Sequence, residues 1–156
     1  MFVEKYDVSK FDRPSVTVDN IAWAEYNNKK WILLIRRAGH PYKGYWALPG
    51  GFLDVKSDKN LEEAALRELR EETGLSKDLL IGETKQFRTY SDIGTDPRTR
   101  IIDVVFSSKF TCEALTDAKA GDDAAETHVF SLDNLPKLGF NHAQIIREYF
   151  ESIENQ

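Results

Sequence analysis

Residues 67–72 carry the charged side chains of this sequence that are best spaced for chemistry, in the order Arg-Glu-Leu-Arg-Glu-Glu. On a helix that turns by about 100° per residue, Glu68, Glu71 and Glu72 share one face, each within about 60° of Glu68. The small and apolar positions among residues 61–65 lie in the same arc. The sequence therefore predicts three carboxylates beside a packing surface.

Two interpretations of these charges are open. Ion pairs between residues three and four apart stabilise a solvated helix face, which fits Glu63, Arg67 and Arg70 because the helical wheel turns them away from the apolar arc. The carboxylate trio fits poorly, because like charges near a packing face are costly unless a cation compensates them. Grouped carboxylates suit Mg²⁺ or Mn²⁺, which bridge phosphates, neutralise developing charge and lower the pKa of an attacking water.

The element that positions the trio is predicted to be a helix over residues 61–73. The segment is rich in strong helix formers, Asn60 and Glu63 make a capping-box pattern, and Gly74 stands where a helix C-cap glycine belongs. A second capping-box pattern, Asn141 with Gln144, precedes apolar residues at helical spacing, so we expect an amphipathic closing helix.

The rest of the chain predicts a sheet. Runs rich in β-forming residues indicate strands over residues 15–24, 31–35, 84–90, 101–110 and 128–132. Asparagines predict a hairpin turn at residues 26–30, a loop with a short strand is expected over residues 39–57, and polar loops over residues 91–100 and 116–126. Without a repeat or linker, residues 1–156 are expected to form one domain. Mostly strands with two helices predict an α/β fold, a mixed β-sheet sandwiched between α-helices.

Composition limits the classes of partner. The 156 residues carry a net charge of −5 with 41% hydrophobic and 30% charged residues, as in a folded globular domain. Mixed signs throughout argue against a nucleic-acid or anionic-membrane surface, and we expect neither a signal peptide nor a membrane-spanning segment. The single Cys112 cannot make an intramolecular disulfide, which favours a cytoplasmic location. A phosphate substrate would have to be held by local arginines and recruited metal ions.

Residues 51–75 resemble the Nudix box. The second half of the box pattern reads Arg-Glu, an aliphatic residue, any residue, Glu-Glu, any residue, Gly and an aliphatic residue, and residues 67–75 match it in full. Residues 46–52, Trp-Ala-Leu-Pro-Gly-Gly-Phe, are also similar to the family's approach to the box. The resemblance implies the Nudix fold, which agrees with the mixed sheet expected above.

The resemblance also implies roles for individual residues of the box. It implies that Glu68 and Glu72 are metal ligands, with Gly51 among the metal-binding residues. It implies that Glu71 is a further ligand or a base-like contributor to catalysis, and that Arg67 orients the carboxylates through ion pairs.

One departure from the box pattern matters. Gly51 and Arg67 are two residues further apart than the pattern allows, so that Lys59 occupies the place of the box's first glutamate, with Asp58 beside it. In the family this glutamate helps to orient the arginine and the metal ligands. Either Asp58 substitutes for it or the role is lost.

Three segments outside the box are similar to the ADP-ribose pyrophosphatase branch, especially to Nudix domains fused to nicotinamide mononucleotide adenylyltransferases. Residues 96–100 resemble an arginine-containing segment that leads into a strand. Residues 121–126 resemble the acidic loop before the last strand, and residues 138–146 resemble a Phe-Asp-His ending with Asn in place of Asp.

Four arginines are candidates for substrate binding. Arg36 and Arg37 end a predicted strand and could face phosphate as forked donors or be an exposed strand end. Arg98 and Arg100 could bind phosphate or be solvated.

Other side chains have a catalytic or binding alternative beside a structural one. Trp46 and Phe87 could stack on adenine or pack in the core. Glu126 could be the general base that activates water or could cap the acidic loop. His142 is assigned to the N-terminus of the closing helix rather than to catalysis.

The function expected from the resemblance is Mg²⁺-dependent hydrolysis of ADP-ribose to AMP and ribose 5-phosphate, with Mn²⁺ as the alternative ion. The partner is then a small-molecule nucleotide, with no nucleic acid and no membrane, and a homodimer is left open. The alternatives are a pyrophosphatase for nucleoside triphosphates or dinucleotides, and a sensor that binds ADP-ribose without cleaving it. Such sensors carry an added DNA-binding winged helix, for which we expect no room here.

Overall fold

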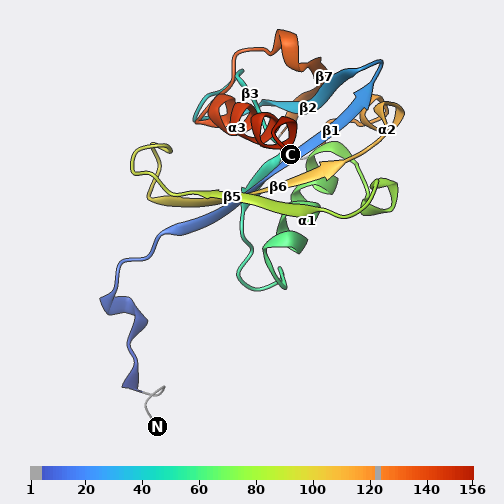
Figure 1. Ribbon diagram of the computed structural model, residues 1–156. Coiled ribbons are helices and arrows are strands. Elements are labelled where there is room, and N and C mark those ends of the chain that lie inside the picture. The colour runs from blue at the N-terminus through green and yellow to red at the C-terminus, as the bar shows by residue number, and fades with distance from the viewer. Residues whose placement is uncertain (1–4, 122–123) are drawn as a thin grey trace.

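The computed structural model describes residues 5–121 and 124–156, and its sheet lies between helices (Figure 1). The strands are β1 (Ser15–Tyr26), β2 (Lys29–Arg37), β3 (Trp46–Ala47), β4 (Gly50–Phe52), β5 (Lys85–Tyr90), β6 (Ile101–Lys109) and β7 (Ala124–Ser131). The helices are α1 (Leu61–Thr73), α2 (Cys112–Thr116) and α3 (His142–Glu154), with short 3-10 turns at Val8–Lys10, Lys77–Leu79 and Leu132–Asn134. Among the described residues, no helix combines the length and apolarity needed to cross a membrane.

The sheet is mixed. Its strand order is β3-β2-β1-β6-β5, with β4 added to β1 and β7 added to β2. The long pair β1 and β6 is parallel, and the other pairs are antiparallel. The parallel pair runs from Ser15 opposite Ile101 to Trp23 opposite Lys109, so these two strands form the centre of the molecule.

The hairpin of β1 and β2 opens along its length, and the opening positions the candidate site. One edge of β1 is taken by β6, so its other edge must serve both β2, at residues 23–26, and β4, at residues 17–19. Between these two pairings, the backbone N–H of Asn20 donates to the carbonyl oxygen of Pro49 at 2.9 Å. The segment that precedes the box therefore enters the gap where β1 and β2 separate.

Alternating residues of β1 face two different cores, as the period of a strand requires. Ile21 and Trp23 pack with buried residues of α3, whereas Ala22 and Ala24 pack on the other side with Leu69 of α1. Figure 1 shows α1 and α3 on opposite sides of the sheet. The predicted fold class, a mixed sheet sandwiched between α-helices, is confirmed.

The local signals around α1 and the first hairpin are confirmed in detail. The helix has the predicted bounds, the Asn60 side chain accepts a hydrogen bond from the Glu63 backbone at 2.9 Å, and Gly74 ends the helix with a φ of 76°. Asn27 and Asn28 have φ values of 54° and 60°, the left-handed conformation that a tight hairpin turn requires.

Two sequence predictions of local structure are wrong, and the short helix α2 lies mostly in residues for which no element was predicted. The strand β7 begins at Ala124, inside the predicted polar loop, because the open edge of β2 supplies backbone partners as far as Arg37. Asn141 makes no side-chain cap bond, since its φ of −101° and ψ of 21° are not the extended conformation of a capping residue.

Candidate active site

A cavity of about 590 Å³ opens where the hairpin separates. Its floor includes Thr17 and Asp19 of β1, and its walls come from β2, from the segment around β4 and from α1. The carboxylates of Glu68 and Glu72 line it, together with the arginines Arg37 and Arg98. Acidic and basic side chains far apart in the sequence therefore share one hollow.

Helix α1 turns two of its three predicted carboxylates into this cavity. Glu68 and Glu72 are lining residues, and a methyl group added to Gly51 would lie 2.7 Å from Glu68 Oε1, so glycine is needed for this close approach. Glu71 is not among the described residues that line the cavity, and 38% of its side chain is exposed. Its role as a ligand or base stays a prediction.

The two inward carboxylates are poorly compensated by the protein. Glu72 is buried, and its Oε2 atom has no hydrogen-bond partner. Burial first, and then the neighbouring Glu68, raise the pKa of Glu72 to about 9. Burial also raises the pKa of Glu68, against the opposing effect of Arg67. Hard oxygen donors, a buried atom without a partner and the close backbone of Gly51 fit a divalent cation such as Mg²⁺ or Mn²⁺.

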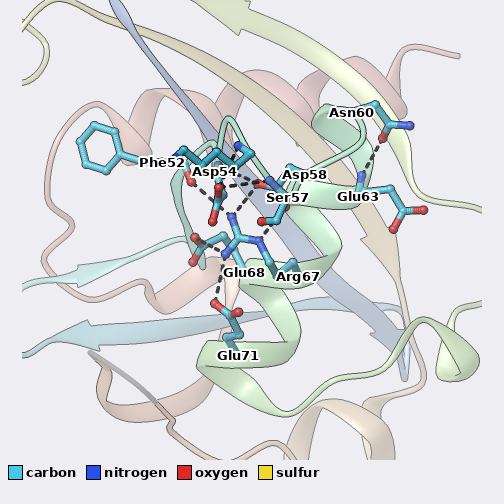
Figure 2. Close-up of polar contacts among 10 residues, drawn as sticks. Phe52, Asp54, Ser57, Asp58, Asn60, Glu63, Arg67, Glu68 and Glu71 are labelled. Atoms are coloured by element: carbon cyan, nitrogen blue, oxygen red, sulfur yellow. Dashed lines mark hydrogen bonds and ion pairs between the residues drawn. The ribbon is translucent and has the colours of Figure 1, made fainter.

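Arg67 lies at the centre of a network of acids, which Figure 2 shows. Its Nε and Nη2 atoms donate to the two carboxylate oxygens of Asp58 at 2.7 and 2.8 Å. Its Nη1 atom donates to Glu68 at 2.9 Å and to Glu71 at 3.1 Å. The outward direction expected from the helical wheel is wrong for Arg67, since its long side chain folds back onto the loop and only 20% of it is exposed. Arg70 is exposed, as expected.

The sequence left open whether Asp58 substitutes for the first glutamate of the box or whether that role is lost. In the structure, Asp58 takes this place beside Arg67. Its side chain is only 4% exposed, and the hydrogen bonds from Arg67 lower its pKa, so it is a buried anion paired with a cation. The backbone N–H of Asp54 also donates to Asp58 Oδ2, at 2.8 Å. The loop between Gly51 and Arg67, which is two residues longer than in the box pattern, thus brings the shorter Asp58 side chain to Arg67. Lys59 is exposed.

The lining of the cavity also combines cations with aromatic rings. The guanidinium of Arg98 lies over the ring of Phe52 at 4.9 Å and is 5.8 Å from the ring of Phe140. Arg37 lies 5.0 Å from the same Phe140 ring. Burial and then the nearby Arg98 lower the pKa of Arg37, against the opposing effects of Glu72, Asp96 and Asp19. Arg98 is also paired with Asp96 at 2.7 Å.

The other predicted substrate and base residues do not line the cavity in the described part of the chain. Arg36 and Glu126 form an ion pair of 2.9 Å across β2 and β7. Trp46 packs on His128 and Phe130, Phe87 packs on Tyr149, and Arg100 is exposed. Trp46 and Phe87 therefore pack against the core, and the binding or catalytic roles of all five residues stay predictions.

Sequence reasoning missed two buried acids, Asp19 and Asp103, and assigned His142 only to a helix end. The three side chains can bring one ligand atom each within 4.8 Å of one another, and all three line the cavity. A signal was present, because each aspartate interrupts an apolar strand, in Val18-Asp19-Asn20-Ile21 and in Ile102-Asp103-Val104. A carboxylate inside such a run requires a partner, and here the partner comes from α3.

Comparison with known proteins identifies the box and its surroundings. The family model described as the NUDIX domain matches residues 17–149. The chain belongs to the Nudix family. It is 43% identical over 152 residues to an ADP-ribose pyrophosphatase of Methanocaldococcus jannaschii, covering 94% of this chain and 81% of the relative. It is therefore a Nudix pyrophosphohydrolase, and the predicted family and enzyme class are confirmed.

A second relative of this Nudix chain has a different role. The ADPR responsive transcriptional repressor NtrR of Acinetobacter baylyi is 29% identical over 155 residues, which are 99% of this chain and 60% of the repressor. The Nudix domain of Shewanella oneidensis NrtR, solved with ADP ribose, superimposes with a TM-score of 0.87 at 26% identity, covering 97% and 96% of the two chains.

The branch predicted from the loops is also found among solved structures. The bifunctional NMN adenylyltransferase/ADP ribose pyrophosphatase of Francisella tularensis, solved with AMP and a Mn ion, matches with a TM-score of 0.72 at 30% identity. The match covers 97% of this Nudix chain and 44% of that protein. The resemblance to Nudix domains fused to an adenylyltransferase is confirmed.

Proposed function

We propose that this Nudix domain hydrolyses ADP-ribose to AMP and ribose 5-phosphate with the help of Mg²⁺ or Mn²⁺. The observation that carries the proposal is the cavity, whose lining combines carboxylates with arginines and phenylalanines. A diphosphate compound needs both, because cations must hold its oxygens and its uncharged parts need apolar contact.

Within the cavity, Glu68, Glu72 and the backbone of Gly51 would hold the divalent ion. When bound, that ion supplies charge neutralisation on the diphosphate and a lower pKa for the attacking water. Arg67 keeps Glu68 and Glu71 oriented through its bonds of 2.9 and 3.1 Å. Glu71 is then the proposed acceptor of the water proton, since it is partly exposed and already fixed by the arginine.

In the same cavity, Arg98 and Arg37 would hold phosphate oxygens, and Phe52 and Phe140 would contact the base or sugar. Burial and the nearby Arg98 disfavour the charged form of Arg37, and a bound phosphate anion would stabilise it. Glu126 is the less favoured base, because its partner is Arg36 on the neighbouring strand, whereas Glu71 shares Arg67 with the proposed cation ligand Glu68.

The test is a product assay with ADP-ribose, with and without Mg²⁺ or Mn²⁺, in parallel with nucleoside triphosphates and dinucleotides. AMP and ribose 5-phosphate should form only with the metal, and faster than any product of the other substrates. Good turnover of a triphosphate with none of ADP-ribose would reject this substrate and favour the alternative pyrophosphatase.

A sensor function is the second candidate, and the repressor relative is the observation that favours it. That relative also weighs against the expectation that no nucleic acid is a partner. Calorimetry distinguishes the two functions, because a sensor would bind ADP-ribose in the presence of Mg²⁺ and release no product. The free thiol of Cys112 supports the proposed cytoplasmic location, and a homodimer stays a prediction.

A further inference from the structure

A chain of four buried groups crosses the floor of the cavity and ends on the segment that leads into the box. Thr17 Oγ1 donates to Asp103 Oδ1 at 2.9 Å, and Asp103 and Asp19 share a hydrogen bond. His142 Nε2 lies 3.3 Å from Asp19 Oδ2. The backbone N–H of Leu48 donates to His142 Nδ1 at 3.0 Å.

The last bond determines which nitrogen of the imidazole carries the proton. A nitrogen that accepts a hydrogen bond has no proton of its own, so Nδ1 of His142 is the bare atom and the ring proton is on Nε2. The protonated Nε2 lies 3.3 Å from Asp19 Oδ2. It has no lone pair for a metal ion, although the residue types Asp19, Asp103 and His142 would otherwise suit one. The arrangement is therefore a row of buried polar groups that ends with the bare Nδ1 accepting from the Leu48 amide.

Near Leu48, the position of the backbone of residues 48–51 is tightly constrained. A methyl group added to Gly50 would lie 2.2 Å from the Val18 carbonyl oxygen and 2.3 Å from Asp19 Oδ1. One added to Gly51 would lie 2.7 Å from Glu68 Oε1. Residues 48–51 therefore run in close contact with β1 on one side and with the box carboxylates on the other, and a small displacement would move the Gly51 backbone relative to Glu68.

We propose that His142 is a positioning residue, whose bare Nδ1 holds the Leu48 amide and so places residues 48–51 against Glu68 and Glu72. Asp19 and Asp103 keep the imidazole in the required tautomer and orientation. His142 acts through the backbone and does not touch the cation or the reacting phosphorus. The inference rests on the proposed function in one respect, since the proposal above takes Gly51 as part of the cation site.

Spectroscopy on the unchanged protein is the first measurement. Two-bond ¹⁵N–¹H correlation of the imidazole should show a protonated Nε2 and a bare, hydrogen-bonded Nδ1 for His142, both without metal and with saturating Mg²⁺. Loss of the Nε2 proton when Mg²⁺ binds would identify His142 as a metal ligand and overturn the proposal.

Two substitutions then distinguish the roles of the two ring nitrogens of His142. In His142→Asn the amide oxygen reaches the place of Nδ1, and in His142→Gln it reaches the place of Nε2. Removing the whole ring in His142→Ala should weaken Mn²⁺ binding and lower kcat by about tenfold or more, as loss of outer-shell partners does. The Asn variant should stay within about threefold of the unchanged protein because the Leu48 bond is kept, and the Gln variant should resemble Ala.

The readouts are Mn²⁺ binding by electron paramagnetic resonance, kcat and KM for ADP-ribose, and thermal unfolding to verify the fold. KM should change less than kcat, because Arg37 and Arg98 are unchanged even though the His142 ring also packs on Phe140 at 5.3 Å. His128→Asn is the matched control, since His128 packs on Trp46 and Phe130 outside the cavity lining. Equal activity of the Asn and Gln variants, or normal Mn²⁺ binding in the Ala variant, would overturn the proposal. If the unchanged protein binds Mn²⁺ without hydrolysing ADP-ribose, the proposed substrate fails while the Mn²⁺ measurements still test His142.

Discussion

Two pairs of buried acids face the same cavity, and they differ in how their oxygens are satisfied. In the α1 pair, burial raises the pKa of both Glu68 and Glu72, and Glu72 Oε2 has no partner in the protein. In the strand pair, Asp19 and Asp103 are engaged by Thr17 and His142, and neither has a buried oxygen without a partner.

The difference indicates that the carboxylates of this cavity have two uses, one in binding a cation and one in holding strands and helix together. A carboxylate whose oxygen is left unpaired in a buried place is costly, and a bound cation removes that cost. A carboxylate that accepts from neighbours on two elements instead locks those elements together. Burial raises the pKa of Asp19 to about 6 and lowers the pKa of His142 to about 4, so at neutral pH a charged Asp19 lies 3.3 Å from a neutral imidazole.

Among the substitutions that test this difference between the two pairs of acids, the largest loss of activity is expected at Glu72. Glu72→Gln should lower kcat/KM for ADP-ribose by at least about 100-fold, because a cation ligand that acts on the diphosphate contributes several kcal/mol. Glu62→Gln is the matched control, being the same change on an exposed position of the same helix, and should keep full activity. An unchanged rate in Glu72→Gln, measured by AMP release, would remove Glu72 from the site.

The next largest effect is expected at Asp58, which supports the α1 pair through Arg67. Asp58→Ala should lower kcat by about 10- to 100-fold, as the loss of a partner that orients metal ligands does. Adding Lys59→Glu, which restores a glutamate at the position counted from the box, should not recover activity, because residue 59 is exposed and it is residue 58 that meets Arg67. Recovery in the double variant would mean that the loop can shift and that Asp58 is dispensable. Lys59→Ala alone should be neutral.

The arginines of the cavity lining should show a smaller effect, confined to substrate affinity. Arg98→Ala should raise KM for ADP-ribose by about tenfold, the value of one charge-assisted hydrogen bond, with kcat nearly unchanged. Arg100→Ala should raise KM by less than about twofold, because its side chain is exposed and outside the cavity lining. A larger rise in KM for Arg100→Ala than for Arg98→Ala would identify Arg100 as the phosphate-binding residue instead.

The smallest effect concerns stability without metal. Burial raises the pKa of Glu72 from 4.5 to about 9, so between these values the folded chain keeps a proton that the unfolded chain has released. The free energy of unfolding should therefore fall as the pH rises through that window, by at least about 1 kcal/mol, and Mg²⁺ should prevent the fall. Urea unfolding with a chelator measures it, and Glu72→Gln should flatten the curve. If the free energy of unfolding falls equally in the unchanged protein and in Glu72→Gln, the proton belongs to another group.

Local signals determined the helix that carries the site. The helix formers, the Asn60 cap and Gly74 lie within one stretch of chain, and each acts on neighbours a few residues away, so α1 was predicted with its observed bounds. The same reasoning failed at β7, whose first residues are held by the edge of β2 and not by their own propensity.

The sequence by itself therefore determined the box helix, the inward direction of Glu68 and Glu72, and, through the motif, the family. Only the tertiary structure decided that Asp58 and not Lys59 meets Arg67, because the path of a loop depends on what it packs against. It also decided the partners of Asp103 and His142, which bond to residues 86 and 94 positions away in the chain. Periodicity and capping describe neighbours in sequence, whereas these contacts depend on the pairing of β1 with β6 and on the docking of α3.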